Sequence, residues 1–202
     1  MFTQVHGAQI YKNKTKQYFG VMSCNTILAR FKAANRQARI KLFIGKCCSF
    51  YGSQTWLINS VYVNDLEVCW RKAPRRLLDL PYTTRSVLLP HLLNCENFKL
   101  QLSLRFVKLL KTIEISKNVK CQMILKNRSK IGTIHKNILE VARLYGANEK
   151  DIVAGRMPHI SATNNSEVRQ RAGAICDFID VANCDCEDQD NFQQIITYLC
   201  TF

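Results

Sequence analysis

The sequence predicts an all-α protein, and three observations carry that prediction. Apolar residues recur at spacings of three and four along most of the chain, the period of helices that bury one face. No stretch shows the alternation of apolar and polar residues that is typical of a half-buried strand. The chain has 202 residues, 47% of them hydrophobic, enough to bury a sizeable core. We therefore expect a small helical bundle followed by a smaller helical extension.

The first expected helices lie in the basic half of the chain. Residues 36–50 ("RQARIKLFIGKCCSF") form a basic amphipathic pattern with Gly52 close to its C-terminal end. In the next helix the apolar stripe consists of Leu66, Cys69, Trp70, Ala73, Leu77 and Leu80. A proline inside a helix costs about 3 kcal/mol. The helix is therefore either kinked at Pro74 or starts late, with Pro74 in its first turn. Pro81 ends it, and "LPYTTR" indicates a turn.

Four more helices are expected downstream. The stripe of the first is Phe98, Leu102, Phe106, Leu109, Leu110 and Ile113. The stripe of the second is Ile134, Ile138, Val141, Ala142 and Tyr145, with Gly146 as its C-cap. Residues 147–165 are expected to be a loop. The third helix carries Val168, Ala172, Ile175 and Ile179 and is capped by Asn164 or Ser166; the last carries Phe192, Ile195, Ile196 and Leu199.

The net charge differs strongly between the first 130 residues and the rest of the chain. Residues 1–130 carry 23 Lys/Arg and 5 Asp/Glu, a net charge of +18, whereas residues 131–202 carry 6 and 10, a net charge of −4. The segment 114–133 is polar and basic, as a linker would be. The expected organisation is an N-terminal lead-in (1–20), a basic helical domain (21–113), a linker (114–133) and an acidic helical extension (134–202).

Catalytic and metal-binding groups do not assemble into a motif. The four histidines are scattered, and none accompanies a nucleophile. Cys184 and Cys186 form one half of a thiolate pair, but no second pair stands at zinc-finger spacing. The acidic run from Asp185 to Asp190 lacks the glycine and the terminal glutamate of a calcium loop. No phosphate-binding Gly-Lys-Ser/Thr loop occurs. We expect no catalytic residue, no metal and no cofactor.

Clustered cations are the remaining signal. A net charge of +14 predicts a polyanionic partner, nucleic acid more readily than a membrane, although any helix also needs a solvated polar face. The expected phosphate contacts are Arg71, Lys72, Arg75 and Arg76, with a second row of Arg30, Arg36, Arg39 and Lys41. Trp70, Phe50 and Tyr51 are candidates for stacking on bases, and for Trp70 the periodicity favours a core position.

Two segments resemble a known family. They are "CCSFYGSQTW" (47–56) and "WRKAPRRLLDLPYTTRSVLLPHL" (70–92). Both resemble parts of open reading frame 2 of non-LTR retrotransposons of the long-interspersed-element class, after the palm of the reverse transcriptase. The matching positions are Ser49, Phe50, Tyr51, Gly52, Ser53, Gln54, Trp56, Trp70, Arg71, Lys72, Arg75, Arg76, Leu77, Leu80, Pro81 and Thr84. The ending "NFQQIITYLCTF" is also similar to the end of such reading frames.

The resemblance implies a thumb-like bundle followed by the C-terminal extension. A polymerase thumb holds the template–primer duplex by backbone contacts. The family's two-metal chemistry needs palm aspartates, and this sequence contains no Asp-Asp pair and no endonuclease domain. We therefore expect no polymerase activity.

The function expected from the sequence is that of a non-catalytic remnant of a retrotransposon reverse transcriptase. It would bind RNA, DNA or their hybrid without sequence specificity. The alternatives are a helical protein-interaction module, and an expressed remnant without selected function. The N-terminus has no secretory signal and no apolar run is long enough to span a membrane, so we expect an intracellular protein, in the nucleus or the cytoplasm.

Overall fold

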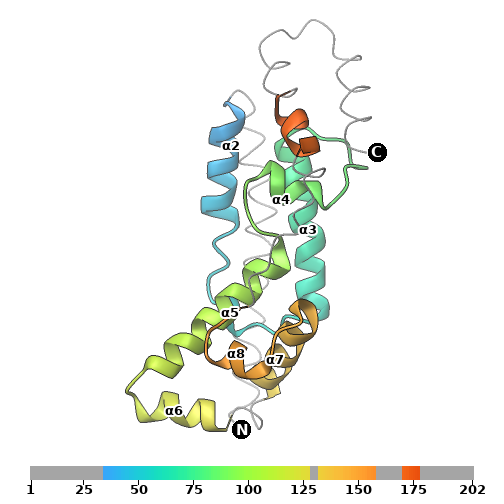
Figure 1. The fold of residues 1–202 in the computed structure, drawn as a ribbon. Helices are drawn as coiled ribbons and strands as arrows, with labels where there is room; N and C mark the ends of the chain where they lie inside the picture. Colours follow the sequence, from blue (N-terminus) through green and yellow to red (C-terminus); the bar gives the residue numbers. More distant parts are fainter. Residues whose placement is uncertain (1–33, 128–131, 158–169, 178–202) are drawn as a thin grey trace, which may run out of the picture. The chain divides into compact units, whose positions relative to one another are not determined.

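The computed structural model describes residues 34–127, 132–157 and 170–177, and these residues contain helices and no strand. The all-α prediction is confirmed (Figure 1). The chain divides into two compact units that alternate along the sequence. The described parts of unit 1 are 34–50, 66–96 and 170–177, and those of unit 2 are 51–65, 97–127 and 132–157. Both ends of the expected linker 114–133 fall inside unit 2.

The described part of unit 1 starts with a helix that changes from α-helical to π-helical winding. α2 (Arg36–Leu42) starts at Asn35, whose side-chain oxygen accepts a hydrogen bond from the Ala38 N–H at 2.8 Å. A π-helical segment, η1 (Phe43–Cys47), follows directly. There the Cys48 N–H donates to the Phe43 carbonyl at 3.3 Å, one residue further back than in an α-helix. The expected helix 36–50 therefore ends at Cys47 and is α-helical only in its first half.

α3 (Val61–Leu77) is the helix that contains Pro74. It starts earlier than the sequence predicted and continues through the proline, so a late start at Pro74 is wrong. Its buried stripe is Val63, Leu66, Trp70, Ala73 and Leu77, spaced by three and four residues as expected. Figure 1 shows α2 and α3 running in opposite directions.

The C-terminal end of α3 is a Schellman motif. Asp79 adopts the left-handed conformation (φ 52°), and the Leu80 N–H donates to the Arg75 carbonyl at 2.7 Å. The expected turn follows, because the Thr84 N–H donates to the Pro81 carbonyl at 3.1 Å. α4 (Leu88–Leu92) comes next and ends in the same way, with Asn94 at φ 50°.

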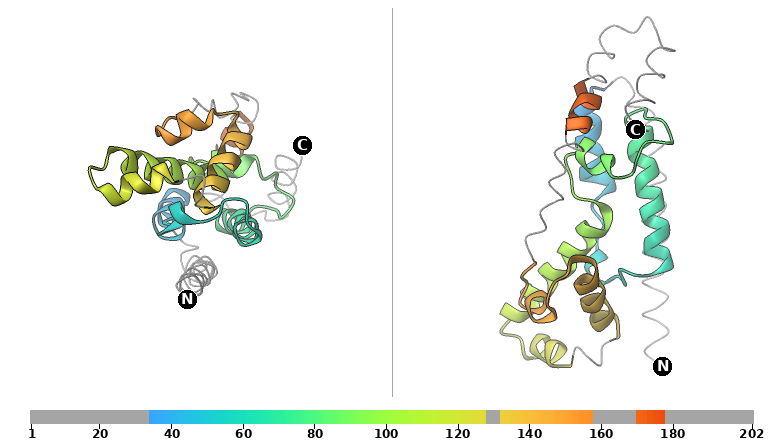
Figure 2. Two further views of the ribbon diagram at one scale, coloured as in Figure 1. Left: turned by 90° about the horizontal axis from the view of Figure 1, so that it is seen from below. Right: turned by 45° about the vertical axis from the view of Figure 1, so that its right-hand side comes forward.

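Besides the first turn of α3, the described residues of unit 2 form four helices and a short 3-10 turn. They are η2 (Ser53–Thr55), α5 (Phe98–Ile115), α6 (Val119–Lys126), α7 (Gly132–Tyr145) and α8 (Glu149–Val153). Their core consists of Ile58, Phe106, Val107, Leu110, Leu125, Ile138, Val141 and Ile152. The stripes expected for α5 and α7 supply half of these residues, namely Phe106, Leu110, Ile138 and Val141. Figure 2 shows α6 lying against α5 after the short connection between them.

Two helices of unit 2 lie where none was expected. α6 lies inside the expected linker, and α8 lies inside the expected loop 147–165. Each begins with an asparagine cap, at Asn118 and Asn148, and each is too short to repeat an amphipathic pattern over several turns. Gly155 (φ 69°) follows the C-cap of α8, Ala154, and an added Cβ there would collide with the side chain of Lys111. Only glycine fits that close approach to α5.

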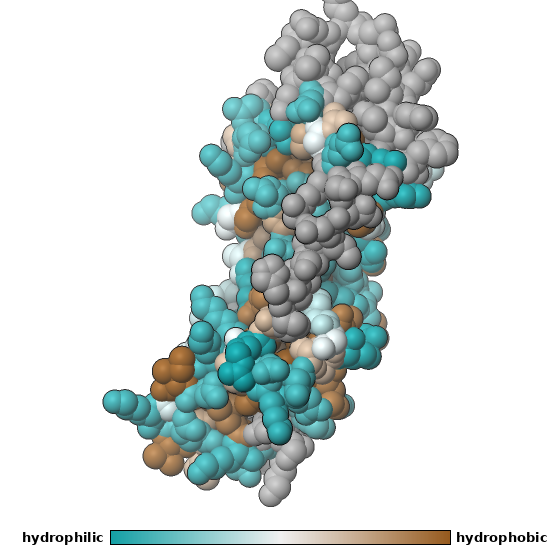
Figure 3. Space-filling model, in the orientation of Figure 1, coloured by the Kyte–Doolittle hydropathy of each residue, from teal (hydrophilic) through white to brown (hydrophobic). Residues whose placement is uncertain are grey.

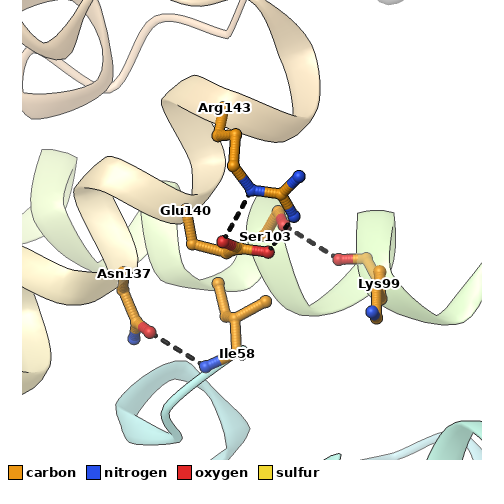
Figure 4. Close-up of polar contacts among 6 residues, drawn as sticks. All are labelled: Ile58, Lys99, Ser103, Asn137, Glu140 and Arg143. Atoms are coloured by element: carbon orange, nitrogen blue, oxygen red, sulfur yellow. Dashed lines mark hydrogen bonds and ion pairs between the residues drawn. The ribbon is translucent and has the colours of Figure 1, made fainter. Parts of the chain in front are cut away.

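Asn137 joins α7 to the segment after η2 (Figure 4). Its side-chain oxygen accepts the Ile58 N–H at 2.9 Å, and its side-chain nitrogen donates to the Trp56 carbonyl at 2.7 Å. Asn137 is fully buried. Its side chain supplies hydrogen bonds to two backbone groups, the Ile58 N–H and the Trp56 carbonyl, that have no partner in a sheet or helix. One turn further along α7, Arg143 donates two hydrogen bonds to Glu140, at 3.1 and 2.7 Å.

Some sequence predictions fall outside the described residues. These are the cap at Asn164 or Ser166, the acidic run Asp185–Asp190 and the last expected helix, Phe192–Leu199. Within the described residues 170–177 the chain is helical, and Ala172 and Ile175 are buried as expected.

Replacing Asn137 by aspartate tests the role of this residue. The carboxylate still accepts from the Ile58 N–H but loses the donor to the Trp56 carbonyl, and it buries a charge. We expect Asn137→Asp to lower the free energy of unfolding by about 2–4 kcal/mol, measured by urea denaturation. The control is Asn64→Asp on the exposed side of α3, which should change it by less than about 0.5 kcal/mol. Equal effects of the two variants would contradict the role of Asn137.

Candidate nucleic-acid interface

Lys72 and Arg76 lie on the outer side of α3. At 100° per residue they point away from Trp70, which is 2% exposed. Both side chains are exposed, and neither forms an ion pair or side-chain hydrogen bond with any described residue. Arg71 is half-buried on the flank of the same helix, and Lys41 is exposed on α2. These four of the expected phosphate contacts are in contact with solvent.

The side chain of Arg75 is directed at residues 84–86, which follow α3. Its Nε and Nη2 donate to the Thr84 carbonyl at 3.1 and 2.5 Å, and Nη2 also donates to Ser86 Oγ at 3.1 Å. Its Nη1 donates to the carbonyl of Arg71 at 2.9 Å. The guanidinium thus joins the last turns of α3 to the segment 84–86. In this arrangement most of its donors are engaged within unit 1.

Arg39 and Arg36 also point inward. Arg39 is 5% exposed, and its Nη1 donates to the Leu77 carbonyl at 2.8 Å and to the Asp79 carboxylate at 3.1 Å. Arg36 is buried as well, and its Nη1 donates to the sulfur of Cys176 at 3.0 Å. Side chains so placed have little surface to offer to a polyanion. Arg30 lies outside the described residues.

The turn after α3 adds a cation that sequence reasoning missed. Arg85 is exposed, and it lies between Thr84 and Ser86, the two residues that Arg75 binds. The turn therefore holds Arg85 close to the end of α3. We call Arg71, Lys72, Arg76 and Arg85 the basic face. The sequence signal was weak, because Arg85 is a single cation outside the helical pattern.

The one acidic residue of the segment 71–86 does not neutralise this surface. Asp79 is paired with Arg39, whose guanidinium is buried behind it. The carboxylate thus compensates an inward-pointing arginine. The charges of Lys72, Arg76 and Arg85 remain uncompensated among the described residues. A surface of this kind attracts anions from solution.

The three aromatic residues considered for stacking on bases differ in their exposure. Trp70 and Phe50 are 2% and 4% exposed, so the core interpretation of Trp70 is confirmed. Tyr51 is 89% exposed but belongs to unit 2, whereas the basic face belongs to unit 1, so we do not assign Tyr51 to that surface. Neither buried ring offers a face to a base in this conformation.

Unit 2 carries a further set of surface lysines, on and beside α5 and α6. Its exposed members are Lys108, Lys111, Lys117, Lys120 and Lys126. Beside them the apolar residues Ile115, Val119 and Met123 are exposed. Figure 3 shows apolar side chains on the surface in the region where α5 meets α6 in Figure 1.

The titratable side chains of the described residues bear on metal binding and on thiol reactivity. No group of three His, Cys, Asp or Glu side chains there could hold a metal ion. Burial raises the pKa of the Cys95 thiol to about 12, and the nearby Cys48 and Glu96 act in the same direction. Its thiolate, the nucleophilic form, is therefore scarce near neutral pH.

Comparison with known proteins identifies no relative of this chain. No family model, no curated protein and no solved structure matches this chain. Among the described helices, none combines the length and apolarity needed to cross a lipid bilayer. The resemblance to retrotransposon reverse transcriptases stays a prediction that depends on the two quoted motifs.

Neighbouring arginines of α3 should differ in their effect on stability. Arg75→Ala removes the donors to the Thr84 carbonyl and Ser86, and we expect a loss of about 1–3 kcal/mol in the free energy of unfolding. Arg76→Ala, the matched control one residue along, should change it by less than about 0.5 kcal/mol. Thermal and urea unfolding followed by circular dichroism measure both. If Arg75→Ala lowered the free energy of unfolding no more than Arg76→Ala does, the contacts of Arg75 would not contribute to stability.

The pKa of Cys95 makes its alkylation rate strongly pH-dependent. Because the thiol stays protonated up to about pH 12, its rate with iodoacetamide should still rise about tenfold per pH unit between pH 8 and 10. Free N-acetylcysteine, the control, should begin to level off in this range. Peptide mass spectrometry measures the initial rates in folded protein. A plateau for Cys95 near pH 9 would contradict the raised pKa.

Proposed function

We propose that this protein binds the backbone of RNA, DNA or an RNA–DNA hybrid, without sequence specificity, through the basic face. The observation that carries the proposal is the exposure of Lys72, Arg76 and Arg85 without a compensating acid among the described residues. Phosphate contacts of this kind supply affinity and no sequence information.

The number of exposed cations sets the expected salt dependence. Each neutralised phosphate contributes a slope of about −0.9 to the plot of log K against log salt for a duplex. Three to four contacts then predict a slope of about −3 to −4. Affinity should fall roughly 40- to 150-fold between 50 and 200 mM salt.

The two retrotransposon-like motifs support an origin as a non-catalytic remnant of a reverse transcriptase. Within the second motif, Trp70 and Leu77 belong to the buried stripe of α3, and Arg75 binds the carbonyl of Thr84. The motif positions thus form one folded element, α3 with its following turn. In the proposed origin this element is the thumb-like surface that meets the template–primer backbone.

A protein-interaction module is the second candidate function. The observation that favours it is the set of exposed apolar residues Ile115, Val119 and Met123, on the same two helices as several exposed lysines. Apolar residues that gather on a surface in this way are common at protein interfaces.

Charge reversal at the basic face tests the first candidate. The variant is Lys72→Glu/Arg76→Glu/Arg85→Glu, and binding of a fluorescein-labelled RNA–DNA hybrid is measured by anisotropy at 50 and 200 mM salt. We expect at least a tenfold loss of affinity and a shallower salt slope. The matched control, Lys117→Glu/Lys120→Glu/Lys126→Glu, makes the same change of net charge in unit 2 and should lose less than about threefold.

The outcomes separate a local site from a net-charge effect. Equal losses in the two triple variants would mean that affinity depends on total charge, and the basic face would not be the site. If the wild-type protein binds neither the hybrid nor single-stranded RNA or DNA at 50 mM salt, the proposed function is wrong.

A further inference from the structure

Tyr82 is an aromatic side chain held outside the fold. It occupies the second position of the turn Pro81–Thr84 and is 90% exposed. It makes no hydrogen bond and no ring contact with any described residue. Burying a tyrosine ring is worth more than burying most side chains, so leaving one in water forgoes a stabilising contribution.

The backbone beneath Tyr82 is fixed. The Pro81 carbonyl accepts both the N–H of Thr84 at 3.1 Å and its hydroxyl at 2.7 Å. Thr84 is 1% exposed, and its own carbonyl accepts the two hydrogen bonds from Arg75. A ring on an anchored turn loses less freedom on binding than a ring on a loose loop, which favours its use as a contact.

Cations of the basic face lie on both elements that this turn joins, α3 and the segment after the turn. Arg85 follows in the same segment, and Arg76 is adjacent in α3 to Arg75, which holds the turn. Aromatic rings combined with cations that follow a phosphate backbone are the two components of sequence-tolerant single-strand binding. A duplex keeps its base faces stacked on one another, whereas unpaired bases leave them free.

We propose that Tyr82 stacks on an unpaired base while the basic face holds the adjoining phosphates, so that this surface prefers single-stranded nucleic acid to duplex. The inference depends on the proposed function of the basic face and adds the class of ligand to it. Arg75 then acts as a positioning residue, because it holds the turn that carries Tyr82.

The test compares two probes and four proteins. The probes are fluorescein-labelled oligothymidylate of twelve nucleotides and a labelled twelve-base-pair duplex, titrated at 50 mM salt with anisotropy as the readout. The proteins are the wild type, Tyr82→Ala, Tyr82→Phe and Tyr51→Ala. Tyr51 is the matched control, since it is an equally exposed tyrosine in unit 2.

The expected pattern is specific to stacking. Tyr82→Ala should weaken binding of the single strand roughly 5- to 150-fold and change duplex binding less than about twofold. Tyr82→Phe, which keeps the ring, should bind as the wild type does, and so should Tyr51→Ala. Since no charge is removed, the salt slope of Tyr82→Ala should equal that of the wild type.

Failure of this inference differs from failure of the proposed function. If Tyr82→Ala binds the single strand as the wild type does, while the triple variant at residues 72, 76 and 85 does not, stacking is wrong and the basic face stands. The exposed ring of Tyr82 would then serve to contact another kind of partner, such as a protein. If Tyr82→Phe is as weak as Tyr82→Ala, the hydroxyl and not the ring makes the contact. No binding of either probe by the wild type would overturn both proposals.

Discussion

The C-terminal end of α3 and the turn after it are held in place by hydrogen bonds from two arginine side chains. The last carbonyls of a helix have no partner within it, and Pro74 removes one further backbone N–H. Arg39 donates to the Leu77 carbonyl, and Arg75 donates to the carbonyls of Arg71 and Thr84. Cationic groups at this end also interact favourably with the helix dipole. The turn after α3 and the residues that it displays depend on these contacts.

The basic sequence of α3 therefore has two roles. Arg75 and Arg76 are neighbours in the chain but lie 100° apart around the helix, so one meets the turn and the other meets water. The buried arginine of α2 adds to the first role by pairing with Asp79 and removing that carboxylate from the charge of the surface. A proposed phosphate-binding surface and the framework that holds it are thus built from the same residue type.

The helices with long apolar stripes could be predicted from the sequence, because a sustained period of 3.6 residues has no other stable arrangement. α5, α7 and the stripe of α3 are of this kind. α6 and α8 were missed because five to eight residues do not complete such a pattern. Their asparagine caps at Asn118 and Asn148, like those at Asn35 and Asn97, were the signal that could have found them. The π-helical segment 43–47 has no comparable signature in the residues.

Residue types alone establish that this chain is helical, that its first 130 residues are strongly basic, and that Trp70 is a core residue. They do not distinguish a structural arginine from one that faces solvent. Arginine has a long side chain, and periodicity gives the direction of its first atoms but not whether a carbonyl lies within reach of its guanidinium. The folded chain decides this, because the carbonyls of Leu77 and Thr84 come within reach of Arg39 and Arg75 only when α2, α3 and the turn pack together.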